Sequence, residues 1–185
     1  MRTLPAILLL VACSAPAQPA KSVAMSTPTV PAVKQYKIAP QTFRDLEKRF
    51  DLRLETLVSN ANEPVDVLGP TRGLYVDDCC VVFTAMVNLV RAQELNPFLR
   101  EIPKDLADRV HARRVERLPL LRKAMDEMLQ AMAMTFVQIP NDQRVVLAVR
   151  LYYASWEDTT GMPAQIMIQA TRAGVQLNKI TEDVQ

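Results

Sequence analysis

The sequence has little glycine, four residues in 185, and this scarcity limits the nucleotide sites it can build. Phosphate-binding loops of the P-loop and dinucleotide-binding types need several glycines close together, because their backbones approach the phosphates closely. Histidine is scarcer, since His111 is the only one. There is therefore no HExxH zinc pattern, and a serine triad would have to use this residue. Three arginines lie within three positions of His111 and disfavour its protonation and metal binding, so we interpret it as a surface residue.

An excess of charge of either sign is also lacking. The chain carries 22 Lys and Arg against 20 Asp and Glu, a formal net charge of +2. This balance favours neither a nucleic acid nor an acidic substrate as the partner. Aromatic residues make up 5%, so we expect a core of Val, Leu, Ile and Met. A hydrophobic content of 49% is ordinary for a globular protein, and the length suffices for one domain with appendages.

The N-terminal segment has the pattern of an export signal. Arg2 supplies a positive charge, and residues 4–11 form an apolar run interrupted only by Pro5. A membrane-spanning helix needs about 20 apolar residues, so this run is too short to be one. We interpret residues 1–12 as a signal segment.

The end of this segment, Leu10-Val11-Ala12-Cys13, resembles the lipobox of bacterial lipoproteins. In that class the signal is cut before the cysteine, which is then acylated. The resemblance covers this segment alone and implies lipidation at Cys13, a membrane anchor and a place in the bacterial cell envelope. The alternative is ordinary signal cleavage after Ala17 or near Ala20, which would leave a soluble periplasmic or secreted protein.

Composition divides the rest of the chain into three parts. Residues 13–40 are rich in Ala, Pro, Ser and Thr, which is typical of an extended tether. A coil of about 27 residues spans roughly 30 Å and would hold a domain clear of a membrane. We predict one folded domain over residues 41–175 and a frayed tail over 176–185.

Two helical regions are predicted from apolar residues that recur at spacings of three and four. The first begins near Gln41 and carries the stripe Phe43, Leu46, Phe50, Leu54 and Leu57. The second opens at Pro103 or Lys104. Pro119 lies inside its pattern, so we predict a break or kink near residues 115–119 and an end near Phe136.

Period-two alternation predicts the strands. Residues 73–90 form the longest β-type run, with Asp77-Asp78 as a turn between strands 72–76 and 79–90. A bulged continuous strand is the competing interpretation, because two aspartates without glycine are not a strong hairpin signal. Further strands are predicted at 65–68, from residue 144 to 156, and from 164 to 171. The second hairpin is closed by the loop at 157–163.

The order of these elements predicts an α+β domain. We expect an antiparallel sheet of four to five strands in two hairpins. The N-terminal helix and the long broken central helix should pack on one face of it.

The densest group of reactive side chains is Asp77, Asp78, Cys79 and Cys80. A redox or metal-dependent activity centred there is one hypothesis. Successive residues of a strand point to opposite faces, however, and carboxylates beside a thiol raise its pKa. We therefore favour a turn followed by a strand, with Cys79 inward and Cys80 outward.

Basic residues gather in the central helix. Arg113, Arg114, Arg117, Arg122 and Lys123 are a candidate surface for anionic lipid headgroups, and a solvated helix face is the simpler interpretation. Together these features predict a lipid-anchored envelope protein that acts as a non-enzymatic binding or assembly module, without a cofactor. Its expected partners are the membrane and another envelope protein.

Overall fold

A helix with one apolar stripe begins the described part of the chain. The computed structural model describes residues 37–58, 65–91 and 102–185. Helix α1 (Pro40–Glu55) starts with a proline, whose missing N–H costs nothing in the first turn. It buries Leu46, Phe50 and Leu54, as the spacing predicts. The predicted signal segment, Cys13 and the tether up to residue 36 lie outside the described residues.

The central run forms a hairpin, as predicted. Strands β2 (Arg72–Val76) and β3 (Cys80–Asn88) pair antiparallel, and the pair Val76–Cys80 closes a three-residue turn. Asp78 in this turn has a φ of 56°, a left-handed conformation that aspartate tolerates better than most residues. The hairpin prediction is therefore confirmed, and the competing interpretation of a bulged continuous strand is wrong.

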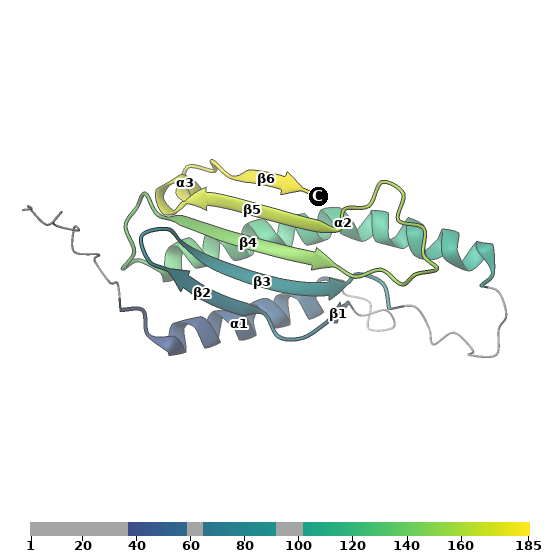
Figure 1. Ribbon diagram of the computed structural model, residues 1–185, viewed down its shortest axis with the longest axis horizontal. Helices are drawn as coiled ribbons and strands as arrows, with labels where there is room; N and C mark the ends of the chain where they lie inside the picture. Colours follow the sequence, from purple (N-terminus) through teal and green to yellow (C-terminus); the bar gives the residue numbers. More distant parts are fainter. Residues whose placement is uncertain (1–36, 59–64, 92–101) are drawn as a thin grey trace, which may run out of the picture. The chain divides into compact units, whose positions relative to one another are not determined.

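The chain forms one mixed sheet with helices on one face, which confirms the α+β class (Figure 1). Strands β1 (Asp66–Val67) and β2 both pair with β3. The sheet then continues through β4 (Arg144–Leu151), β5 (Gln165–Thr171) and β6 (Thr181–Val184). Its six strands exceed the four to five that we predicted.

The sheet is not purely antiparallel, because β3 and β4 are parallel. Helix α2 (Lys104–Thr135) connects them, and its 32 residues span about 48 Å. This length carries the chain back along the sheet, so β4 starts beside the first residue of β3, with Arg144 opposite Cys80. A helical crossover of this kind joins parallel strands. The antiparallel prediction is therefore corrected at this one pair.

Helix α2 runs unbroken through Pro119, so the predicted break is wrong. Pro119 and Val115, the residue four positions before it, are both exposed. Water can therefore reach the Val115 carbonyl that lacks an intrahelical partner. Arg114 and Leu118 before the proline, and Leu121 after it, keep the buried stripe continuous.

The C-terminal residues are ordered, in contrast to the frayed tail predicted for 176–185. Helix α3 (Arg172–Gln176) follows β5 directly, and the Thr171 hydroxyl accepts a hydrogen bond from the Gly174 N–H at 3.0 Å. Strand β6 then pairs antiparallel with β5. All four of its residues are exposed, so backbone pairing rather than burial forms this strand.

The core lies between the helices and the inner face of the sheet, formed by the buried alternate residues of β3, β4 and β5. Phe43, Phe50, Phe83 and Phe136 gather there, with ring centroids 5.1 to 6.1 Å apart. Four of the five phenylalanines thus form one cluster. A Cβ at Gly73 would lie 2.6 Å from the Phe83 ring, so the cluster requires glycine there.

Helix α1 also contacts the edge of β2 that faces away from β3. The Gly73 N–H donates to Glu47 Oε1 at 2.9 Å, and the Thr71 N–H donates to Asp51 Oδ1 at 2.8 Å. These carboxylates occupy donors that an incoming strand would need.

Candidate functional site

Among the described residues, the largest group of buried charge surrounds Arg114, where the sheet meets the N-terminal half of α2. Arg114 continues the core-facing stripe of α2, and its side chain is fully buried. Its guanidinium forms a bidentate pair with Glu157, with Nε 2.5 Å and Nη2 2.8 Å from the carboxylate oxygens. The Glu157 side chain is 3% exposed. Two fully desolvated charges are tolerated only when each is paired and hydrogen-bonded.

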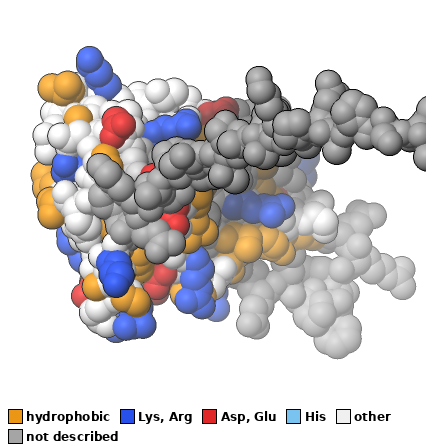
Figure 2. Space-filling model, turned by 60° about the vertical axis from the view of Figure 1, so that its left-hand side comes forward, with side chains coloured by type: hydrophobic (Ala, Val, Ile, Leu, Met, Phe, Trp, Pro, Cys, Tyr) orange, Lys and Arg blue, Asp and Glu red, His pale blue; other side chains and the backbone are white. Residues whose placement is uncertain are grey.

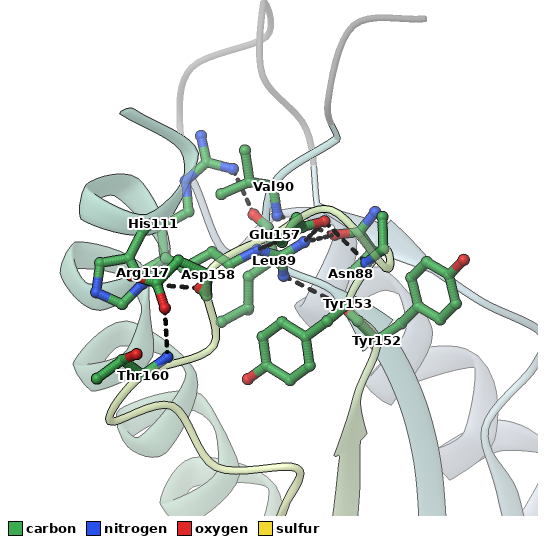
Figure 3. Close-up of polar contacts among 12 residues, drawn as sticks. Asn88, Leu89, Val90, His111, Arg117, Tyr152, Tyr153, Glu157, Asp158 and Thr160 are labelled. Atoms are coloured by element: carbon green, nitrogen blue, oxygen red, sulfur yellow. Dashed lines mark hydrogen bonds and ion pairs between the residues drawn. The ribbon is translucent and has the colours of Figure 1, made fainter. Parts of the chain in front are cut away.

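The remaining contacts of this pair tie three segments together (Figure 3). Arg114 donates to the Tyr152 carbonyl at 3.1 Å and to Asn88 Oδ1 at 2.9 Å. Its Cζ lies 4.8 Å from the centroid of the Tyr153 ring. Glu157 Oε1 also accepts the Ala154 N–H at 3.0 Å. The pair thus fastens the ends of β3 and β4 to α2, and its chemistry is that of a structural clamp.

Polar groups beside this pair form hydrogen bonds in the loop that joins β4 to β5. His111 Nδ1 lies 2.9 Å from the Asp158 carbonyl oxygen, and Asp158 Oδ1 accepts the Thr160 N–H at 2.9 Å. Hydrogen bonds from Thr160 lower the pKa of Asp158. Burial raises the pKa of the Tyr153 hydroxyl, which donates to the Pro163 carbonyl at 2.6 Å. Within the described ranges, no three His, Cys, Asp or Glu side chains are grouped to hold a metal ion.

The predicted reactive group divides at the hairpin turn. Asp77, Asp78 and Cys79 lie in the turn, and Cys80 begins β3. The register places Cys80 on the predicted outer face, yet it is only 8% exposed, less than Cys79. Burial first, then the Cys79 thiol, raises the pKa of Cys80 from 9.0 to about 11. At neutral pH the Cys80 thiolate that redox chemistry needs is therefore scarce.

The five basic residues proposed for anionic lipid do not form one surface. Arg114 and Arg117 are buried, and Arg117 donates to the Leu89 carbonyl at 2.5 Å. Arg122 pairs with Glu182 at 2.7 Å, while Arg113 and Lys123 are exposed. Basic side chains in Figure 2 are scattered among apolar and acidic ones on the side shown. Because the buried stripe of α2 includes positions 114 and 117, the basic residues of this region are divided between core and surface.

The second candidate is the outer face of the sheet, which α1 and α2 leave uncovered. Strand register assigns to it the residues that alternate with the core. Among them Leu74 is 49% exposed, Val76 is 42% exposed and Met86 is 37% exposed. The apolar members of the outer face are Leu74, Val76, Val82, Met86, Val146, Ala148 and Met167.

Arg72, Arg144 and Arg150 stand among these apolar residues. Within residues 37–58, 65–91 and 102–185, no carboxylate forms an ion pair with any of the three. Arg150 also borders a shallow groove of about 280 Å³ at the β1 side of the face. The other residues lining this groove are Leu68, Pro70, Thr84, Ala85, Met86, Ala148 and Gln165.

No family model, curated protein or solved structure matches this chain. Among the described residues, no helix has both the length and the apolar character that crossing a membrane requires.

Sequence reasoning missed both candidates, the Arg114–Glu157 pair and the apolar outer face of the sheet. Arg114 occupies a position where the spacing of Val110 and Leu118 calls for a buried residue, so an arginine there signals a buried ion pair. Alternation could have indicated part of the outer face, because Val82, Val146 and Met167 fall at the alternate positions of strands whose other face is the core.

Proposed function

We propose that this chain is an exported protein of the bacterial cell envelope, lipid-anchored at Cys13, whose domain is a non-enzymatic binding or assembly module. The pattern of residues 1–13 supports the anchor. The binding role rests on the outer face, because a contiguous apolar patch left in water is typical of an interaction site.

The chemistry of the buried groups favours binding over catalysis. Arg114 and Glu157 form their hydrogen bonds with each other, with the backbone and with Asn88, and burial favours the neutral thiol of Cys80. A catalytic residue would need a reactive group directed at a substrate. The outer face instead offers side-chain contacts over several strands, as a partner surface does.

The anchor is tested by labelling cells with a palmitate analogue and separating membrane from soluble fractions. The wild-type chain should be labelled and sediment with membranes, whereas Cys13→Ala should lose both properties. Cys79→Ser is the matched control and should keep both. An unlabelled, soluble wild-type chain would support the periplasmic or secreted alternative.

The binding role is tested by photo-crosslinking in cells. A photoreactive amino acid at Leu74 or Val76 should give a discrete adduct with an envelope protein. The same probe at Met134, which is 70% exposed on α2, is the control for general surface reactivity. Equal adducts at all three positions, or none at Leu74 and Val76, would contradict a binding role for the outer face.

A further inference from the structure

We propose that the outer face docks a protein segment in which apolar side chains alternate with carboxylates. This inference rests on the proposed binding function and specifies its partner. An apolar side chain of the segment fills the groove beside Met86, and its carboxylates pair with Arg72, Arg144 and Arg150.

The apolar part of this surface is continuous across three strands. Leu74 is paired with Val82, and Val82 with Val146, so one row crosses β2, β3 and β4. Met86 lies in the groove beyond this row. The groove holds about 280 Å³ and is shallow, whereas sites for small ligands enclose most of the ligand surface. Because it is open to solvent, the groove suits a side chain of a partner surface better than a ligand that must be enclosed.

The charge of the surface selects the partner. Two aspartates share the outer register with the three arginines, and Asp66 is already paired with Arg91 at 3.6 Å. Only Asp183 remains, on the edge strand β6. Among strand residues of the outer register the surplus is therefore positive, and guanidinium groups bind carboxylates through paired hydrogen bonds.

Two other occupants fit less well. Residues 1–36 of this chain contain no Asp or Glu and carry Arg2, Lys21 and Lys34, the same sign as the face. A second copy of the domain would bring its own three arginines to the contact. Addition of a strand at the β2 edge is opposed by Glu47 and Asp51, which already accept the N–H groups there.

The proposal is tested by selecting peptides from a random displayed library on the full chain. Selected peptides should be enriched in Asp or Glu beside Leu, Ile or Phe. Their affinity should fall about tenfold or more in Arg150→Gln and in Met86→Ser, as for central interface residues, and should decline with added salt. Arg49→Gln, an exposed residue on α1, is the control and should bind as wild type does. Circular dichroism melting confirms that each variant is folded.

Several outcomes would overturn the proposal. They include basic or uncharged selected peptides, binding insensitive to both outer-face variants, and no selected binder. Vesicles containing phosphatidylglycerol that bind more weakly to Arg150→Gln, without peptide selection, would assign the face to a membrane. Sedimentation showing a dimer that Met86→Ser dissociates would assign it to a second copy. If crosslinking at Leu74 fails while acidic peptides bind, the proposed function is wrong but the preference of the outer face for acidic, apolar segments is supported. If crosslinking succeeds while acidic peptides do not bind, only the present inference is wrong.

Discussion

The two faces of the sheet are formed by alternate residues of the same strands, and they differ in what covers them. On β3, Val81, Phe83 and Val87 are fully buried against the helices, while Thr84 and Met86 between them are open to solvent. Burial of apolar area stabilises the fold by roughly 25 cal/mol per Å², whereas area left in water contributes little. The comparison separates two roles, because the inner face holds the domain together and the outer face keeps apolar area for contact.

Phe83→Ala should break the inner face and give the largest effect. It removes the ring at the centre of the phenylalanine cluster and leaves a cavity, so we expect the free energy of unfolding to fall by about 3 to 5 kcal/mol. Urea denaturation followed by circular dichroism measures the change. Met86→Ala, on the same strand but the opposite face, is the control and should cost about 1 kcal/mol or less. Equal losses would contradict the division between the faces.

Glu157→Gln should come next, because it leaves the Arg114 charge buried without its counterion. Breaking a buried pair in this way costs about 3 kcal/mol or more, also measurable by urea denaturation. The matched control is Asp105→Asn, which removes the partner of Arg109 in an exposed pair at 2.9 Å. That change should cost under about 0.5 kcal/mol. A stable Glu157→Gln domain would mean that the clamp at the end of the sheet is dispensable.

Local patterns in the sequence predicted much of the inner face. The spacing of Leu46, Phe50 and Leu54 identified α1, and alternation identified the buried sets of β3, β4 and β5. Each of these signals depends on neighbouring residues and one buried side. The relative direction of two strands leaves no such local signal. The parallel pairing of β3 and β4 therefore could not be predicted before the path of α2 was known.

The features that escaped prediction lack a local apolar signal. Strand β6 has no buried side, and its Thr181, Glu182 and Asp183 are typical of a tail. Pro119 suggested a break because it leaves the Val115 carbonyl without its helical partner. Whether water can replace that partner depends on exposure, which the sequence does not show. Arg114 looked like a surface cation, since its counterion Glu157 is 43 residues away in sequence. The clamp therefore needed the tertiary structure, whereas alternation alone could have indicated part of the outer face.

The Cys80 thiol gives a smaller effect that depends on pH. Its pKa is about 11 in the folded domain and 9.0 ordinarily, so the folded state retains the proton between these values. The resulting stabilisation is complete below pH 9 and is lost as pH rises through 11. Iodoacetamide followed by mass spectrometry should modify the more exposed Cys79 first at pH 8. Rapid modification of Cys80 at pH 8 would contradict its protection and would revive the redox hypothesis.

Leu74→Thr should have the smallest effect on stability and sharpens the comparison most. Leu74 is 49% exposed, and threonine is well suited to a strand, so the free energy of unfolding should change by less than about 0.5 kcal/mol. Val81→Thr places the same side chain on the inner face at a fully buried position, where a hydroxyl without a partner costs about 1 to 3 kcal/mol. Partner binding should respond in the opposite order to stability. With the photoreactive amino acid at Val76, the crosslinked adduct should weaken in Leu74→Thr. It should persist in Val81→Thr, measured under conditions where that variant is folded. A large loss of stability in Leu74→Thr would show that the outer face also holds the fold together, and the apolar residues there would then need no partner to explain them.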